Sequence, residues 1–432
     1  MSILTAMSTG VSGLDAEGEA LGVIGNNLAN SNTIGFKESR AVFDNVLGAS
    51  VGTEGAIGQG VRMTTAQQIF SEGALSNTGL PTDVALSGDG FFVVNGGVGG
   101  QTGNFYTRAG QTSLDKTGTL VNPDGLAFQG YPANPDGTFS TTMGPMKVNT
   151  AALSPKTTTS LSMTANLDSS QATPVAAFDP QNPGTTSNYS TSMQIYDSLG
   201  TAHTVNVFFA KTGAAGSGTW DYHVLASGSE VTGGTAGQNS EIATGSLSFT
   251  SSGALQSNAP TSGGTVSFNG ATANQPLTFN FGTPIADGGT GLDGATQYSA
   301  PSSVSAQSQD GYSSGALTGI SIDGTGTVSG TYTNGQTIPV GQLAVAKFTS
   351  NTGLGQAGQN LWAATKDSGL PALGAAGSGG RAAIVTGSLE SSNVDISAQF
   401  VDLIAHQASF QADSKTITTA DQMLQALMQM KQ

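Results

Sequence analysis

The sequence predicts a mixed fold, in which long helices at the two ends of the chain form a coiled-coil layer and nested all-β domains of sandwich or barrel type lie between them. Near the C-terminus an apolar residue recurs at every seventh position, which is the spacing of a coiled-coil seam. Near the N-terminus apolar residues recur at spacings of three, four and seven. The middle has short β-branched and aromatic runs, and 62 of the 432 residues are glycine, which favours many turns and short strands.

The N-terminal helix is expected over residues 2–28. Its apolar stripe, a candidate self-assembly surface, consists of Leu4, Met7, Val11, Leu14, Leu21 and Leu28. Gly18, Gly22 and Gly25 each weaken such a helix by roughly 1 kcal/mol relative to alanine. Either this is simply a poor helix, or the small residues let another helix approach closely and the helix is ordered only when packed. The polar run 30–33 and Gly35 predict where the helix ends.

Residues 36–80 give a mixed pattern. Phe36, Val42 and Phe43 fit a short amphipathic segment, and the glycines from Gly52 to Gly60 predict a loop after it. We therefore expect a connecting region over 33–80.

The pattern changes to β-strand from about Asp83. Phe91–Val94 is a typical buried strand, and shorter runs follow it at hairpin spacing. A Thr/Ser-rich passage at 155–162 predicts a boundary, beyond which alternating runs such as 204–209 and 220–224 form a second β region. Near Tyr312 the chain is expected to return to the first β domain.

This order predicts domains inserted one within another. The expected parts are a terminal helical domain of residues 1–32 and 392–432, a connecting region of 33–80, a discontinuous middle β domain of 81–157 and 312–391, and an inserted outer β domain of 158–311, in one or two subdomains.

The C-terminal helix is expected from Val394 onward. Its seam, the second candidate self-assembly surface, consists of Ile396, Leu403, Phe410, Ile417 and Leu424. The other faces are rich in Gln, Ser and Thr and almost uncharged, whereas an ordinary surface helix carries Glu–Lys pairs. Such a face suits a wall past which unfolded chains slide without binding. The candidate channel-lining residues are Gln407, Gln411, Gln422 and Gln429.

Composition excludes several classes of protein. The net charge is −15, and the only basic residue between Thr157 and Ala346 is Lys211, so no basic face for nucleic acid is expected. There is no cysteine for a disulfide or a thiolate metal site, and no apolar run long enough for membrane insertion. The first residues do not resemble a cleavable signal peptide. The protein is expected either to stay in the cytoplasm or to be exported by a dedicated apparatus.

No constellation of catalytic residues is apparent. His203, His223 and His406 are not spaced as metal ligands, and we expect His406 to have a polar role on its helix face. The chain contains neither a nucleophile elbow nor a phosphate-binding loop ending in Lys-Ser or Lys-Thr. We therefore expect no enzyme activity, no cofactor, and no catalytic, cofactor-binding or metal-ligating residue.

Two terminal motifs resemble those of the flagellar rod and hook axial proteins. The N-terminal signature residues are Asn26, Asn27, Leu28, Asn30, Thr33, Gly35 and Phe36. The C-terminal signature residues are Leu389, Glu390, Ser392, Asn393, Val394 and Asp395. Motifs in the middle of the chain, at 196–203, 309–312, 332–336 and 348–354, resemble the hook branch of that superfamily.

The resemblance implies a structural subunit that self-assembles into a flexible curved tube, a universal joint that transmits torque from rod to filament around a central export channel. It implies partners as well: other copies of the chain, the hook cap, the distal rod, the hook–filament junction proteins and the flagellar export apparatus. The expected location is the extracellular hook of the basal body. Alternatives are a distal rod or junction subunit, and more remotely a β-rich surface adhesin, which would normally carry a signal peptide or an anchor.

Overall fold

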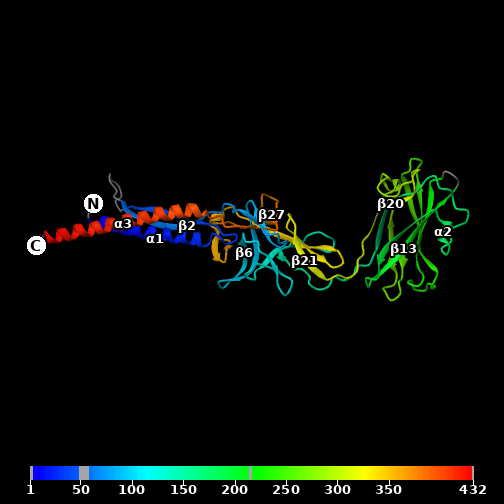
Figure 1. Ribbon diagram of the computed structural model, residues 1–432, viewed down its shortest axis with the longest axis horizontal. Coiled ribbons are helices and arrows are strands. Elements are labelled where there is room, and N and C mark those ends of the chain that lie inside the picture. The colour runs from blue at the N-terminus through cyan, green and yellow to red at the C-terminus, as the bar shows by residue number, and fades with distance from the viewer. Residues whose placement is uncertain (1–2, 48–57, 214–216, 431–432) are drawn as a thin grey trace. The chain divides into compact units, whose positions relative to one another are not determined.

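The computed structural model describes residues 3–47, 58–213 and 217–430. These residues are mostly β-strand, with one long helix near each end of the chain. They form two compact units (Figure 1). The first unit is Met1–Thr150, Gly319–Thr331 and Thr337–Gln432, and the second is Ala151–Thr318 and Tyr332–Gln336. The expectation of helical ends around a β-rich middle is therefore confirmed, and the coiled-coil layer stays a prediction.

The first unit contains both long helices. Helix α1 spans Ile3–Ala29 and helix α3 spans Ile396–Gln429, and they lie side by side and antiparallel (Figure 1). Asp395 caps α3, because its carboxylate accepts hydrogen bonds from the backbone N–H groups of Ser397 and Ala398. The α1 backbone ends in the predicted polar run, where the Asn30 side chain bonds back to the carbonyl of Asn26.

A β-hairpin occupies most of the expected connecting region. Strands β1 (Ser39–Leu47) and β2 (Gly58–Gln68) pair antiparallel and pack against α1. The expected loop at Gly52 and Gly55 lies outside the described residues, whereas Gly58 and Gly60 belong to β2. Packing against α1 stabilises the hairpin. The apolar pattern of the segment itself is too weak to predict a strand.

The β part of the first unit is built around one antiparallel sheet. Its strand order is β21–β22–β23–β9–β5–β6–β25–β24, and β7, β8, β10 and β26 pair with its members. Two further pairs, β4–β27 and β3–β28, form small separate sheets. The strands of all three sheets are β3 (Leu75–Asn77), β4 (Val84–Ser87), β5 (Phe91–Val98), β6 (Gln101–Thr107), β7 (Ser113–Leu114), β8 (Leu120–Val121), β9 (Ala127–Pro132), β10 (Gly144–Pro145), β21 (Leu317–Ile322), β22 (Thr327–Tyr332), β23 (Thr337–Lys347), β24 (Gly355–Gly358), β25 (Leu361–Ala363), β26 (Ala372–Ala375), β27 (Ala383–Thr386) and β28 (Ser388–Glu390). A short 3-10 helix, η2, spans Asn351–Gly353.

An aromatic cluster holds this sheet together. Phe91 of β5 contacts the rings of Phe70, Phe348 and Trp362, and Tyr106 lies edge-on to Phe348. Phe91 is the predicted buried strand residue, and it is fully buried. The cluster joins segments from both halves of the chain.

The second unit is a separate β structure. Its five-stranded antiparallel sheet has the order β12–β13–β14–β15–β16, and a three-stranded sheet has the order β19–β11–β20. Residues of both sheets pack into one hydrophobic cluster around Trp220. The elements are β11 (Ser160–Asn166), α2 (Pro183–Thr186), β12 (Tyr189–Tyr196), β13 (Ala202–Thr212), β14 (Thr219–Ser227), β15 (Asn239–Phe249), β16 (Leu255–Gly263), β17 (Thr265–Val266), β18 (Gln275–Pro276), β19 (Thr278–Asn280), η1 (Ile285–Asp287) and β20 (Ser303–Gln309).

The described residues contain neither a membrane-spanning helix nor a metal-binding cluster. Over 3–47, 58–213 and 217–430, no helix has the length and apolarity needed to cross a membrane. The same residues contain no cluster of three or more His, Cys, Asp or Glu side chains that could hold a metal ion.

Candidate functional site

Small residues form the contact between the two long helices. The buried face of α1 is Gly10, Gly13, Ala16, Ala20 and Ile24. A Cβ atom added to Gly10 would lie 2.9 Å from the Ile417 side chain, and one added to Gly13 would meet the Asp413 carboxylate. Because Gly10 and Gly13 have no side chains, the backbones of the two helices can lie close together at these positions.

The predicted α1 stripe lies beside this buried face and is only partly covered. Met7, Leu14, Leu21 and Leu28 are half-buried, and Val11 is 43% exposed. The surroundings of the Leu4 side chain lie outside the described part of the structure. Apolar groups at these positions remain available to other chains.

The predicted α3 seam is divided between two environments. Leu403, Ile417 and Leu424 are half-buried, whereas Ile396 and Phe410 are exposed. The candidate channel-lining residues Gln407, Gln411, Gln422 and Gln429 are all exposed. At 100° per residue these glutamines share one side of the helix, away from α1.

His406 joins the two helices. Its Nδ1 lies 2.5 Å from Oε2 of Glu17, and its ring contacts Phe43 of β1. This is the expected polar role on a helix face, and Glu17 is the partner that the sequence did not indicate.

The terminal signatures meet at the end of the helix pair. Asn27 is 1% exposed, and its amide nitrogen donates to the carbonyl of Ser39 at 2.7 Å and to Oε1 of Gln399 at 3.1 Å. Its amide oxygen accepts from the N–H of Ser39 at 2.9 Å. One side chain thus joins α1, β1 and α3.

A buried charge cluster lies behind this junction. Glu390 is fully buried; its Oε1 lies 2.5 Å from Nζ of Lys37 and its Oε2 lies 3.2 Å from Nη1 of Arg108. The N–H of Gly73 also donates to Oε1 at 3.0 Å. Burial lowers the pKa of Lys37, and the negative charge of Glu390 opposes that shift. The cluster ties the N-terminal signature to the C-terminal signature and to the β sheet.

Other signature residues fix the backbone at the same junction. Gly35 has φ +71° and its N–H donates to the carbonyl of Glu390 at 2.8 Å. A Cβ atom there would lie 2.6 Å from the backbone nitrogen of Ala109, so both the conformation and the space require glycine. Asn393 accepts from the N–H of Glu38 and donates to the carbonyl of Ile69. Thr33 bonds to Asn30, and the N–H of Phe36 donates to Thr33.

The rest of the C-terminal signature is shared between the sheet and the helix cap. Leu389 is buried in β28, Ser392 accepts from the N–H of Val394, and Asp395 is the cap of α3. Burial raises the pKa of Glu38, and the nearby carboxylates of Asp395 and Asp402 add to that shift.

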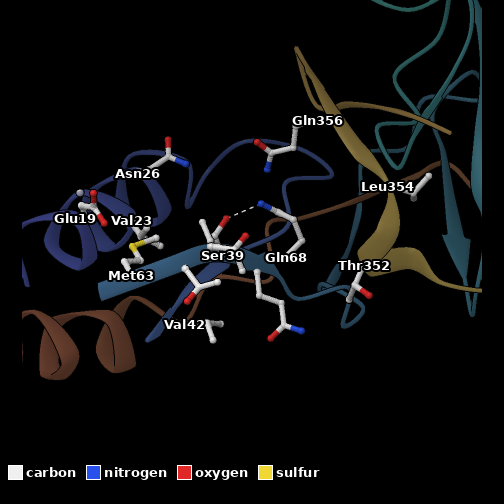
Figure 2. Close-up of a pocket in the computed structure, with 15 residues that line it drawn as sticks. Glu19, Val23, Asn26, Ser39, Val42, Met63, Gln68, Thr352, Leu354 and Gln356 are labelled. Carbon is white, nitrogen blue, oxygen red and sulfur yellow. Dashed lines mark hydrogen bonds between the residues drawn. The ribbon is translucent and has the colours of Figure 1, made fainter. Parts of the chain in front are cut away.

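An open groove of about 950 Å³ runs between α1, the hairpin and the segment before β24. Figure 2 shows Glu19, Val23 and Asn26 of α1 on one side, Met63 and Ser39 of the hairpin below, and Thr352, Leu354 and Gln356 on the other side. Its lining is mostly uncharged, and such a surface suits contact with another polypeptide better than chemistry on a small molecule.

In the second unit, residues in and near the motifs that resemble the hook branch make buried structural contacts. His203 stacks on Phe268 and lies between Glu230 and Asp197, at 2.8 and 3.3 Å from their oxygens. Lys211 is buried and donates to the carbonyls of Ser169 and Gln171. The one basic residue between Thr157 and Ala346 is therefore removed from the surface.

Asp310 anchors the start of β11. Burial alone would raise its pKa, but hydrogen bonds from the N–H groups of Ser160 and Thr159 lower the pKa to about 2.

Sequence reasoning missed several residues of the junction. Arg108, Gln399 and Glu17 carry no local pattern that marks them, and each acts through a partner far away in the chain. Lys37 directly follows Phe36 at the end of the N-terminal signature, and its pairing with Glu390 was not predicted.

Four family models match parts of the chain. They are described as the Flagella basal body rod protein at residues 7–37, the Flagellar hook protein FlgE/F/G D1 domain at 85–166, the Flagellar basal body protein FlaE D2 domain at 166–312, and the Flagellar basal body rod FlgEFG protein C-terminal at 385–430.

Relatives of full length are similar as well. The flagellar hook protein FlgE of Escherichia coli is 36% identical over 433 residues, with 99% of this chain and 100% of the relative covered. Those of Salmonella typhimurium and Treponema pallidum are 35% and 31% identical at the same coverage. The crystal structure of Helicobacter pylori flagellar hook protein FlgE2 superposes with a TM-score of 0.52 at 16% identity, covering 73% of this chain and 100% of that one, and it supports the fold.

Proposed function

This chain belongs to the family of flagellar hook proteins FlgE and is a structural subunit of the hook, and we propose that copies of it assemble through α1 and α3 into a curved tube. The observation that carries the proposal is the pair of helices whose predicted assembly stripes are left partly uncovered in the single chain. Apolar surface on both helices gains free energy when another copy removes it from water.

In the proposed tube, residues 1–32 and 392–432 form an inner coiled-coil layer. The Gln-rich side of α3 faces the export channel. The middle β domain, residues 81–157 and 312–391, makes a middle layer. Residues 158–311 form the outer domain, and the hairpin at 39–68 extends the helical layer toward the middle one.

The surface of the outer domain suits a joint that bends while it rotates. Contacts between copies must shorten on the inner side of the curve and lengthen on the outer side in each turn. Small uncharged side chains slide past one another at little cost, whereas interlocked apolar cores resist such motion. The buried Lys211 leaves this domain without an exposed cation between residues 157 and 318, so that strong ion pairs between outer domains are not available to stiffen the tube.

The proposed partners follow from the place of the hook. We infer contacts with further copies, the distal rod, the hook cap and the hook–filament junction proteins, and passage through the flagellar export apparatus. The proposed location is the extracellular hook attached to the basal body. We propose no enzymatic role.

Deletion of the gene followed by electron microscopy of basal bodies tests this function. Complete rods without hooks or filaments are expected. Loss of the distal rod would place the chain in the rod, hooks without filaments would place it at the junction, and intact flagella would point to another role such as adhesion. Complementation with the wild-type gene is the control.

A further inference from the structure

The outer side of α3 changes character along its length. Ile396, Phe400, Val401 and Ile404 form an apolar face, with Phe400 48% exposed and Ile404 64% exposed. From Gln407 onward the same side carries glutamine, serine and threonine together with Lys415. An apolar face cannot serve as the wall of a water-filled channel without cost, so this part of α3 needs a cover that the single chain does not supply.

Helix α1 has an open face of small residues that could accommodate the bulky apolar face of α3. Val11, Gly18, Gly22 and Gly25 lie on one side of α1, opposite the face that contacts α3, and all four are exposed. A Cβ atom added to any of the three glycines would have no neighbour within 4 Å. Gly22 also lines the groove of Figure 2, so that the recess widens on that side.

The two faces lie at the same level of the helix pair. Gln399 meets Asn27 and His406 meets Glu17, which places Phe400 and Ile404 level with residues between 17 and 27 of α1. The open glycines occupy that interval. A neighbouring copy that is displaced sideways, with little shift along the helices, would bring its bulky α3 face against this recess.

Charge matches at the same register. Ile417 contacts Gly10 and Asp413 contacts Gly13, so Lys415 lies level with residues 11 and 12, about one helical turn from Asp15. Lys415 and Asp15 are both exposed, and neither has an ion pair among the described residues. The displacement that seats Phe400 and Ile404 on the glycines therefore also brings opposite charges together.

We propose that the apolar face of α3, Ile396 to Ile404, packs on the open Val11–Gly25 face of α1 in a second copy of this chain. This inference rests on the proposed function and specifies one contact of the tube. The contact is heterologous, since it joins two different surfaces, and such contacts generate open helical polymers. Accordingly, the side of α3 from Ile396 to Ile404 is a contact between subunits and not part of the channel wall.

Disulfide cross-linking in assembled hooks tests the contact, and the chain has no native cysteine to interfere. Gly22→Cys and Ile404→Cys are combined in one chain. The two thiols point to opposite sides of the helix pair, too far apart for a bond within a chain. Oxidised hooks are expected to give a ladder of dimers and higher oligomers on a non-reducing gel. Gly22→Cys with Gln422→Cys, an equally exposed position at another level, should give none.

Hooks of normal length whose thiols react with a maleimide but form no ladder would overturn the proposal. If the first pair of cysteines blocks assembly, the pair Gly25→Cys and Phe400→Cys tests the same contact by the same gel.

Reversal of the charges of Asp15 and Lys415 in the full-length protein is an independent test of the contact. Asp15→Lys and Lys415→Asp are each expected to lower the number of hooks per cell about fivefold or more, and the double variant is expected to restore it. Failure of the double variant to restore hooks, together with no cross-link, would refute the register. The gene deletion described above tests hook function separately, so the two failures are distinguishable.

Discussion

The amide of Asn27 donates a hydrogen bond to Oε1 of Gln399, a residue 372 positions further along the chain. This bond joins the last turns of α1 to the first turn of α3. Because Asn27 also bonds twice to the backbone of Ser39, its position fixes where the hairpin leaves the helix pair.

Asn27→Ala should loosen this end of the helix pair. Two backbone groups of Ser39 and the Gln399 side chain would lose a buried partner, which costs roughly 2 kcal/mol. We expect amide hydrogen exchange in the C-terminal half of α1 to become about thirtyfold faster at that energy. The neighbouring Asn26 is exposed, and Asn26→Ala is the control that should leave the exchange rate nearly unchanged. Equal effects of the two substitutions would contradict the assigned role.

Glu390→Gln should strongly destabilise the first unit. It would leave Lys37 and Arg108 buried without a carboxylate, and breaking such a buried pair costs about 3–5 kcal/mol. The urea midpoint of unfolding, followed by fluorescence of Trp362, should fall accordingly. Glu72→Gln changes the same chemical group at an exposed position, and should shift the midpoint little. A small shift for both variants would show that the charge cluster contributes little.

Gly35→Ala and Gly79→Ala form a matched test of space at a glycine. The two residues have nearly the same φ, +71° and +70°, so both substitutions carry a similar conformational penalty of roughly 1–2 kcal/mol. Only at Gly35 would the new Cβ atom meet backbone, at Ala109, whereas Gly79 is open. Gly35→Ala should therefore lower the free energy of unfolding by about 1–3 kcal/mol more than Gly79→Ala, and lower the melting temperature further. Identical melting temperatures would remove the steric argument.

Acid should weaken the second unit through Asp310. Its pKa of about 2 in the folded protein lies below the usual value of 3.8, so the stabilisation is complete above pH 4 and is lost as the pH falls through 2. The side chain is 31% exposed, and solvent screening reduces the contribution to about 1 kcal/mol. Comparison of wild type with Asp310→Asn by thermal unfolding should show a constant difference at pH 5–7 that shrinks toward pH 2. A difference independent of pH would contradict this assignment.

Charge on the Gln-rich side of α3 should slow export. In cells that assemble hooks from a chain carrying both Gln407→Lys and Gln411→Lys, we expect filaments to grow more slowly, because a ring of cations would bind acidic segments of passing chains. Filament length against time, measured on labelled cells, gives the rate. Gln407→Asn with Gln411→Asn keeps the face uncharged and should leave the rate unchanged. Normal growth of the lysine variant would count against a channel-facing position.

Sequence patterns located the long helices well, because each carries its own signals. The helix predicted over 2–28 is α1 at Ile3–Ala29, ended by the polar run at 30–33, and Asp395 starts α3 as a cap. The strand at Phe91–Val98 was predictable, because the apolar run Phe91–Val94 is typical of a buried strand.

The contacts between elements were not predictable to the same degree. The buried face of α1 uses Gly10, Gly13 and Ala16, which hydropathy does not mark, while the larger Leu and Val residues stay partly uncovered. The hairpin at 39–68 depends on α1 for its burial rather than on its own pattern. The partners of Glu390 come from residues 37 and 108, and a single sequence contains no signal that pairs them.

The buried Lys211 has a practical consequence for the intact protein. Trypsin cleaves after lysine and arginine, and from residue 157 to residue 346 the chain offers it this one position, inside β13. Residues 157–318 of the second unit are thus resistant to trypsin, and digestion should attack the helical ends and the first unit while leaving this stretch whole.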